Sequence, residues 1–103
     1  MSTILDIEKI RSQFPTLHKT VNGKPLIYFD NGATSQTPQC VIDRLKTYYE
    51  DENSNIHRGV HTLSQEATAA YEDSRRKLQE YLNASREEEV LFTKGTTDAI
   101  NLV

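Results

Sequence analysis

The sequence predicts an α/β fold, in which short buried strands alternate with amphipathic helices. Residues 26–29 (LIYF) and 90–93 (VLFT) have the apolar composition of strands, and each stretch leads into turn-forming residues. Residues 37–50 and 63–82 repeat apolar side chains at spacings of three and four, which is typical of helices. The length of 103 residues corresponds to one small domain at most.

The N-terminal quarter is expected to hold a short helix and a hairpin. A helix over residues 6–14 is favoured by Asp6 as its N-cap and by Pro15, which stops it. The Asn-Gly dipeptide at residues 22–23 is a strong hairpin signal. It precedes the expected buried strand at 26–29.

A second helix is expected over residues 37–50. Thr37 has the composition of an N-cap, and Pro38 suits the first helical position. Cys40 would fall in the first turn, where a thiol becomes more acidic. Because no basic residue is near in sequence, we expect a buried structural cysteine rather than a nucleophile.

The helix over residues 63–82 is the longest that the sequence predicts. Thr62 and Gln65 have the spacing of a capping box. Two acid-first pairs at spacing four are expected on its outer face, Glu72–Arg76 and Asp73–Lys77. The expected buried stripe consists of Ala67, Ala70, Tyr71, Ser74, Leu78, Tyr81 and Leu82.

The C-terminal residues predict one further turn, strand and helix. Ser85 and Glu88 form a second capping box, and a helix opens at about Thr97, after the strand at 90–93. We expect this helix to continue past Val103, because no C-cap signal precedes the last residue. The apolar share of 36% is also low, so we expect the core to need a partner or more chain.

Composition excludes several classes of protein. A net charge of −3 argues against a nucleic-acid partner. No apolar run is long enough to span a membrane, and the acidic Asp6 does not suit a signal peptide. One cysteine excludes an internal disulfide and a cysteine-rich zinc site. The sequence therefore predicts a soluble cytoplasmic protein.

An anion site is the strongest chemical signal. Gly95, Thr96 and Thr97 lie between an expected strand and an expected helix, where free N–H groups and threonine hydroxyls can hold a phosphate. The alternative is a threonine N-cap without any ligand, and Asp98 slightly disfavours an anion.

Two histidines and an arginine form a second candidate site. His57 and His61 have the spacing of metal ligands on a helix, but Gly59 lies between them and no third ligand is near. We therefore expect one structural histidine and one in a cleft. Arg58 offers a fork for a carboxylate, or else a surface or interface ion pair.

A third candidate is the loop at residues 30–34 (DNGAT), which follows the end of an expected strand. Ligand crevices form at such ends in α/β sheets, and small residues would let a ligand approach the backbone. Taken alone, these residues favour an ordinary tight turn over a ligand site.

Several ordered motifs resemble one family. Residues 14–15 (FP), 21–26 (VNGKPL), 28–34 (YFDNGAT), 55–64 (NIHRGVHTLS) and 92–103 (FTKGTTDAINLV) are similar to the N-terminal region of SUF-type cysteine desulfurases. These are pyridoxal-phosphate enzymes of the class V aminotransferase family, which also includes selenocysteine lyases. The resemblance covers essentially the whole chain.

The resemblance implies an activity and an assembly. Such enzymes convert L-cysteine to L-alanine and an enzyme persulfide that feeds iron–sulfur cluster assembly through a SUF sulfur-acceptor protein. They are homodimers of the aspartate-aminotransferase fold (fold type I). Residues 1–20 would then pack with the small domain, and residues 21–103 would begin the large, cofactor-binding domain.

The resemblance also implies roles for single residues. Gly95, Thr96 and Thr97 would bind the cofactor phosphate, while Gly32, Ala33, His57 and Arg58 would line the substrate end. The Schiff-base lysine and the persulfide cysteine would lie beyond Val103, since neither Lys94 nor Cys40 has the right position. These 103 residues alone would then be inactive.

Two alternatives stay open at this point. The chain could belong to a selenocysteine lyase or another class V member, because the segment that discriminates them is not among these residues. It could also be a non-catalytic fragment that binds a partner.

Overall fold

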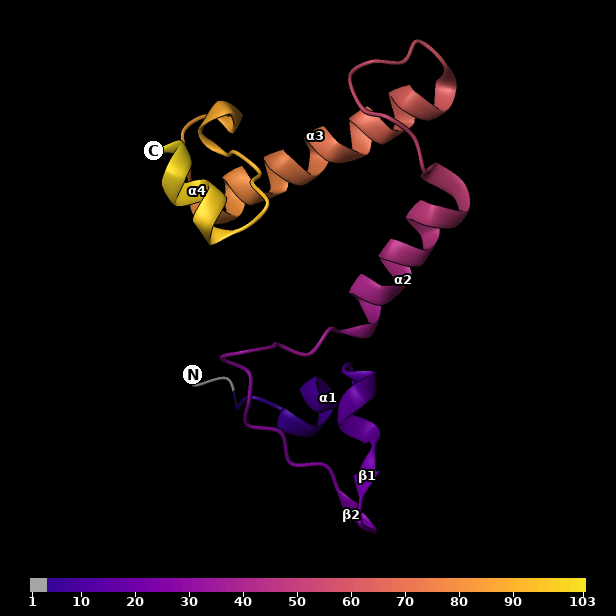
Figure 1. Cartoon of the computed structure of the whole chain (residues 1–103), viewed down its shortest axis with the longest axis vertical. Coiled ribbons are helices and arrows are strands. Elements are labelled where there is room, and N and C mark those ends of the chain that lie inside the picture. The colour runs from indigo at the N-terminus through magenta and orange to yellow at the C-terminus, as the bar shows by residue number, and fades with distance from the viewer. Residues whose placement is uncertain (1–3) are drawn as a thin grey trace. The chain divides into compact units, whose positions relative to one another are not determined.

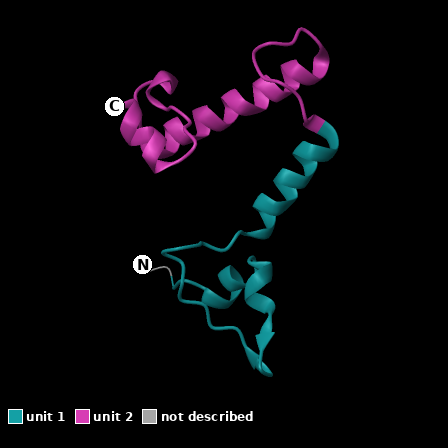
Figure 2. Ribbon diagram, in the orientation of Figure 1, with its two compact units in different colours: residues 1–51 teal, residues 52–103 magenta. Residues whose placement is uncertain are grey.

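The computed structural model describes residues 4–103, and helices account for most of its regular structure (Figure 1). The chain divides into two compact units, residues 1–51 and 52–103, and each is described by itself (Figure 2). The predicted boundary after residue 20 concerns the domains of a complete enzyme, and it stays a prediction.

Unit 1 begins with the short helix α1 (Ile7–Arg11). The Asp6 carboxylate accepts a hydrogen bond from the Lys9 N–H at 3.0 Å, which confirms the predicted N-cap. The helix ends earlier than residue 14, and a 3-10 turn, η1 (Pro15–His18), starts at the proline. This agrees with the incompatibility of proline with a continuing α-helix.

The predicted hairpin forms at the Asn-Gly turn. Strands β1 (Thr20–Val21) and β2 (Lys24–Pro25) pair in antiparallel register. Asn22 and Gly23 both have positive φ, 52° and 74°, as the tightest hairpin turns require.

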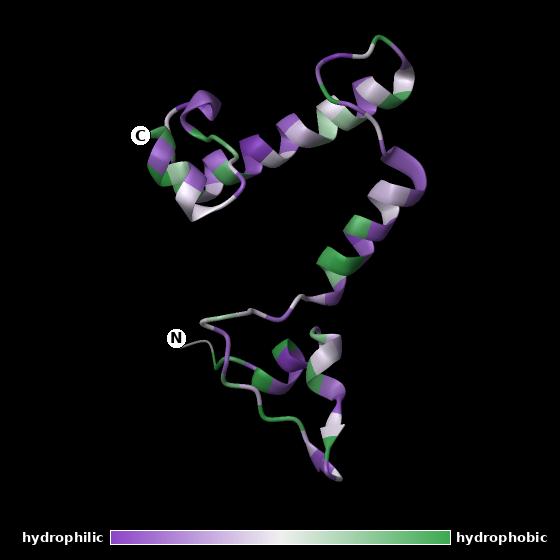
Figure 3. Cartoon of the chain, viewed as in Figure 1, coloured by the Kyte–Doolittle hydropathy of each residue, from purple (hydrophilic) through white to green (hydrophobic). Residues whose placement is uncertain are grey.

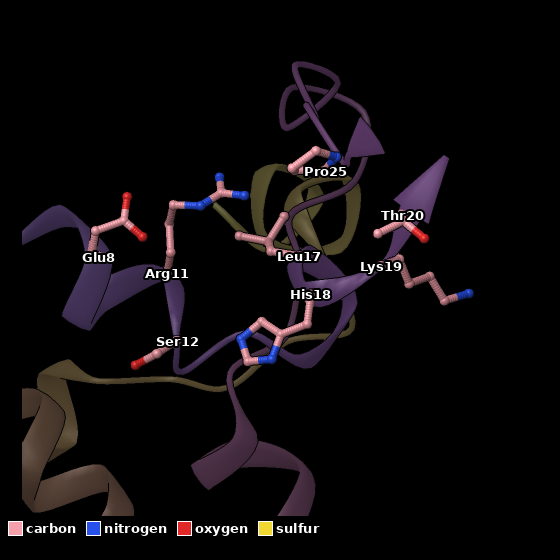
Figure 4. A pocket seen from close by; sticks show the side chains of 8 residues that line it. All are labelled: Glu8, Arg11, Ser12, Leu17, His18, Lys19, Thr20 and Pro25. Atoms are coloured by element: carbon pink, nitrogen blue, oxygen red, sulfur yellow. The ribbon is translucent and has the colours of Figure 1, made fainter. Parts of the chain in front are cut away.

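A hollow of about 500 Å³ opens between α1, η1 and the hairpin (Figure 4). Arg11 and Leu17 lie on its border, together with Glu8, Ser12, His18, Lys19, Thr20 and Pro25. The lining includes one acidic side chain, Glu8, and two basic ones, Arg11 and Lys19.

The prediction of a buried strand at residues 26–29 is wrong. In residues 4–103 the single sheet is β1–β2, and the side chains of Ile27 and Phe29 are 74% and 93% exposed. A strand is stabilised by hydrogen bonds to a neighbouring strand, and none of the described segments provides one here.

Helix α2 (Gln39–Thr47) follows, and it continues into one π-helical turn, η2 (Tyr48–Glu52). The predicted caps are wrong by one residue, because Pro38 has an extended backbone (ψ 153°) and is itself the N-cap. The Gln39 N–H donates to the Gln13 carbonyl at 2.7 Å, which ties the start of α2 to the N-terminal segment. The expectation of a buried cysteine is also wrong, since Cys40 is exposed.

Unit 2 is built on the long helix α3 (Thr62–Leu82). Its N-cap is His61, whose ring Nδ1 accepts from the Ser64 N–H at 3.3 Å, so the predicted Thr62–Gln65 capping box is not the cap. Asn83 closes the helix in the left-handed conformation (φ 55°), which asparagine tolerates better than most residues.

The surface of α3 differs from the predicted pattern in two respects. Of the expected apolar stripe only Ala67 is buried, and the most buried residue is Ser64, at 0% exposure. Asp73 pairs with Lys77 at 2.8 Å as predicted, but Glu72 does not pair with Arg76, which instead contacts Asp73 at 3.3 Å. Glu72 turns toward the preceding loop, as described below.

After α3 the chain folds back along the end of that helix (Figure 1). A 3-10 turn, η3 (Glu87–Glu89), is closed by the Glu89 carboxylate, which accepts from the Ser85 N–H at 3.2 Å. The predicted capping box pairs Ser85 with Glu88, and this prediction is wrong by one residue, because the acceptor is Glu89. Val90 is buried and extended, yet residues 90–93 pair with no described strand, so this predicted strand is not formed. Helix α4 (Thr96–Leu102) follows.

Apolar side chains remain exposed along both units (Figure 3). On α2 the exposed fractions are 44% for Val41, 40% for Ile42 and 53% for Leu45. Apolar faces of this kind are normally covered by other protein surface. Within residues 4–103, no helix combines the length and apolar content needed to cross a membrane.

Candidate functional site

The loop at residues 55–61, here called the His57 loop, is held against one face of α3. Three polar residues of that helix, Ser64, Thr68 and Glu72, form what we call the polar stripe. Because they are four residues apart, they lie one above another on the same face of the helix. Each of them forms a hydrogen bond to the loop, so the polar stripe holds the loop from three successive turns of the helix.

Ser64 and Thr68 bind the backbone of the loop. The Ser64 hydroxyl donates to the Asn55 carbonyl at 2.7 Å and accepts from the Gly59 N–H at 3.1 Å. The Thr68 hydroxyl accepts from the His57 N–H at 3.0 Å. His57 itself has φ +60°, a conformation that costs free energy in a residue other than glycine.

Glu72 binds the His57 side chain. Its Oε1 lies 2.8 Å from His57 Nε2, and its Oε2 lies 3.7 Å from Arg75 Nε. The guanidinium carbon of Arg75 lies over the Tyr71 ring, 5.5 Å from its centre. A side-chain hydrogen bond with Tyr71 and the charge of Glu72 both raise the pKa of Arg75. Arg75 is therefore a permanent cation beside the carboxylate.

Three rings link the His57 loop to the segment before α4. The His57 and Tyr71 rings meet edge to face at 5.7 Å between centroids, and the Tyr71 and Phe92 rings at 5.1 Å. Phe92 precedes Gly95 by three residues. Unit 2 therefore joins two predicted site segments, those at His57 and at Gly95, through contacts on a single helix.

The turn at residues 94–98, here called the Gly95 turn, has the features of an anion site. Gly95 has φ 155° and ψ −177°, a conformation that is essentially restricted to glycine. It is the N-cap of α4, and because glycine has no side chain, it makes no side-chain hydrogen bond to the free N–H groups of the first turn. The helix start therefore offers uncapped donors to a ligand.

Space and neighbouring charge at the Gly95 turn also suit a phosphate. A hollow of about 460 Å³ opens there, and a Cβ atom at Gly95 would meet nothing within 4 Å. The Asp98 carboxylate accepts from the Lys94 N–H at 3.1 Å, which partly satisfies its negative charge. The hollow is lined by Lys94, Gly95, Thr96, Thr97, Asp98 and Asn101. The residues present fit a phosphate group.

The loop at residues 30–34, here called the Gly32 loop, belongs to unit 1. The Tyr28 hydroxyl donates to the Thr34 carbonyl at 2.5 Å. The same hydroxyl lies 3.2 Å from the Asp30 carbonyl oxygen. The Thr34 N–H closes a turn by donating to the Asp30 carbonyl at 3.0 Å. Around Gly32 the loop is exposed, and a Cβ atom there would meet nothing within 4 Å.

Two further candidate residues are His61 and Arg58. His61 caps α3, so it is the structural member of the histidine pair. Arg58 is exposed next to His57. Across residues 4–103, no three histidine, cysteine or acidic side chains gather in a way that could hold a metal ion.

Residues 27–103 match the family model described as Aminotransferase class-V. The chain belongs to this family. The match includes the Gly32 loop, the His57 loop and the Gly95 turn, which are the segments singled out above.

Curated relatives and a solved structure agree with this assignment. The chain is 53% identical, over its whole length, to a probable cysteine desulfurase of Mycobacterium leprae and 56% identical, over 95% of its length, to a cysteine desulfurase of Synechococcus elongatus. It superposes with a TM-score of 0.82 on the apo structure of a cysteine desulfurase from Thermococcus onnurineus NA1, at 40% identity over 99% of this chain. The predicted fold class is thereby confirmed.

The chain is much shorter than these proteins. It spans 17% and 16% of the two curated relatives and 24% of the solved chain. The activity, substrates and partners of a complete protein are therefore proposals.

The sequence interpretation missed Glu72 and the polar stripe. Glu72 was assigned to a surface pair because a charged residue on a helix usually faces solvent. The signal that could have found it is the spacing of Ser64, Thr68 and Glu72, since polar residues four apart form a polar face as regular as an apolar one.

Proposed function

We propose that this chain is the N-terminal part of a pyridoxal-phosphate-dependent cysteine desulfurase. The complete enzyme would convert L-cysteine to L-alanine and retain the sulfur as an enzyme persulfide for iron–sulfur cluster assembly. The family match and the names of the relatives support the reaction class. The observation that carries the proposal is the uncapped start of α4 beside a glycine-only turn.

The Gly95 turn would hold the phosphate of the cofactor. The N–H groups of Thr96 and Thr97 would donate to phosphate oxygens, and a threonine hydroxyl would add another donor. Gly95 would let the backbone approach closely, because it has no side chain in the hollow. When bound, pyridoxal phosphate supplies an electron sink for bonds of the amino acid.

Residues of the His57 loop and residues of the Gly32 loop would each contact the substrate. His57 would present a ring nitrogen to the bound L-cysteine, and Arg58 would place a guanidinium fork for its carboxylate or for a second subunit. Gly32 and Ala33 would line the substrate site, where the lack of a side chain on one and the small methyl group of the other leave the backbone open to the substrate. A homodimer and a SUF-type sulfur acceptor complete the proposed assembly.

Two catalytic groups are proposed to lie outside these 103 residues. Neither Lys94 nor the exposed Cys40 is assigned as the Schiff-base lysine or the persulfide cysteine. Without those groups the segment would not turn over L-cysteine on its own.

The test uses the complete protein, prepared with pyridoxal phosphate and supplied with L-cysteine and a thiol that takes the outer sulfur from the enzyme persulfide. We expect the absorbance of bound cofactor and one L-alanine released for each sulfur transferred. L-selenocysteine, assayed in parallel, separates a desulfurase from a selenocysteine lyase. A complete protein that binds the cofactor but releases no L-alanine would refute the proposed reaction.

A variant tests the phosphate assignment directly. Thr97→Val removes one hydroxyl donor while keeping the shape of the side chain, so we expect weaker retention of the cofactor during dialysis. Thr47→Val, at the exposed end of α2, makes the same chemical change away from the Gly95 turn. Equal retention in the two variants would remove Thr97 from the site.

A further inference from the structure

We propose that Glu72 is a positioning residue, which holds the His57 ring by accepting a hydrogen bond from its Nε2–H and leaves Nδ1 as the free acceptor. The inference deepens the proposed function, on which the role of His57 at the substrate end rests. Glu72 itself would touch neither substrate nor cofactor.

The first argument is the chemistry of the 2.8 Å contact. An ionised carboxylate can only accept hydrogen bonds, so the imidazole nitrogen facing it must carry a proton. In the neutral ring this assigns the proton to Nε2 and the lone pair to Nδ1. The side chains of His57 and Glu72 are 49% and 34% exposed, so the contact is partly shielded from water.

The second argument is the backbone of His57. Its φ of +60° is unfavourable, and it is maintained while its N–H bonds to the hydroxyl of Thr68. Thr68 and Glu72 are one helical turn apart, so α3 holds the backbone and the ring of the same residue from the same face. Strain of this kind tends to persist at sites where one conformation is needed.

The third argument is what surrounds the pair. The charged and titratable side chains that face His57 and Glu72 are Arg75 and Tyr71. Arg75 Nε is buried, has no hydrogen-bond partner among the described residues and lies 3.7 Å from Glu72 Oε2, so the carboxylate lies between the imidazole and the guanidinium. The edge of Tyr71 restricts the tilt of the imidazole ring.

The experiment observes the ring itself in the complete, cofactor-loaded protein labelled with ¹⁵N-histidine. The His57 signal is assigned by its loss in His57→Gln. We expect an Nε2–H proton that exchanges slowly with water in the parent, faster in Glu72→Gln and too fast to observe in Glu72→Ala. Glu66→Gln, an exposed charge loss on the same helix, should leave the signal unchanged.

Turnover of L-cysteine is the second readout. The general acid–base contribution of a positioned histidine is of order 10²–10⁴, and we expect Glu72→Ala to lose roughly tenfold in kcat/KM by letting the ring rotate. Glu72→Gln should lie between Glu72→Ala and the parent, because an amide oxygen still accepts a weaker hydrogen bond. Glu66→Gln should match the parent.

The outcomes separate the two proposals. A ring signal that survives in Glu72→Ala, or a lost signal with unchanged turnover, would overturn the positioning role. A parent that turns over no L-cysteine would refute the proposed reaction, while the ring signal would still decide whether Glu72 holds His57.

Discussion

The two loops proposed to face the substrate are held in different ways. The His57 loop is bonded to three side chains of one long helix, and one of them, Ser64, is fully buried. The Gly32 loop is bonded to the hydroxyls of Tyr28 and Ser35 and to its own backbone, and it is exposed. The first loop is therefore pre-organised by contacts within unit 2, whereas unit 1 fixes the second one only weakly.

The difference follows from where each loop lies in the chain. The His57 loop immediately precedes α3, so residues at spacing four on that helix reach back to it one turn at a time. The Gly32 loop precedes a stretch of irregular backbone before α2, and no helical face lies within reach in sequence. The following predictions test this contrast, from the largest expected effect to the smallest.

Removing the buried hydroxyl should have the largest effect. Ser64→Ala leaves the Asn55 carbonyl and the Gly59 N–H without their partner at a part-buried position, which should cost about 2–4 kcal/mol of local stability. The measurement is hydrogen exchange of the amides at residues 55–61 in the complete protein. Exchange should accelerate there and not in the Gly32 loop.

Ser74→Ala is the matched control for that substitution. Ser74 lies on the same helix, is exposed and donates only to the Ala70 carbonyl at 3.0 Å. Its loss should leave exchange in the His57 loop unchanged. If both variants behave alike, the polar stripe does not hold the loop.

A pair of glycine substitutions compares the two loops directly. A Cβ atom at Gly59 would lie 2.5 Å from both Cβ and Oγ of Ser64, so Gly59→Ala should destabilise the His57 loop by about 1–3 kcal/mol. A Cβ atom at Gly32 would meet nothing within 4 Å, so Gly32→Ala should change the stability of its loop little. Hydrogen exchange of each loop gives the two values, and equal effects would contradict the contrast.

Local signals of the sequence predicted local structure well. Asp6 caps α1, the Asn-Gly dipeptide makes the hairpin, and the 21-residue helix α3 spans nearly the predicted range. Each of these depends on residues within a few positions of one another. Gly95 as a special turn before a helix was predicted for the same reason.

What failed depends on distant partners. Residues 26–29 and 90–93 have strand composition, but a strand needs a neighbour, and composition does not say where that neighbour comes from. Cys40 was expected to be buried from its average behaviour, and no described segment covers it. Glu72 was assigned by the commonest role of its residue type, whereas its contact to His57 spans 15 positions.

Removing the Tyr28 hydroxyl should have a smaller effect than the changes in unit 2. Tyr28→Phe deletes the hydrogen bond to the Thr34 carbonyl and the longer contact to the Asp30 carbonyl, but solvent can replace them at an exposed loop. We therefore expect a loss of about 0.5–1 kcal/mol in the opening free energy of residues 30–34. A loss as large as that of Ser64→Ala would mean that the Gly32 loop is as firmly held as the His57 loop.

The smallest effect is expected on the outer face of α3, where Asp73 contacts Lys77 at 2.8 Å. The hydrogen bond from Lys77 lowers the pKa of Asp73 below its usual 3.8, so the pair contributes stability above that pH and loses it as the pH falls through the lowered value. Lys77→Met should therefore lower the urea midpoint slightly near neutral pH, and the difference from the parent should vanish only once the pH is below the lowered pKa of Asp73. Lys46→Met, which removes a looser 3.9 Å contact to Glu50 on α2 and η2, is the control, and it should lower the urea midpoint near neutral pH by less than Lys77→Met does. Since both pairs are exposed and screened by salt, a large effect in either variant would show that charge on the outer faces contributes as much as the buried hydroxyl of Ser64.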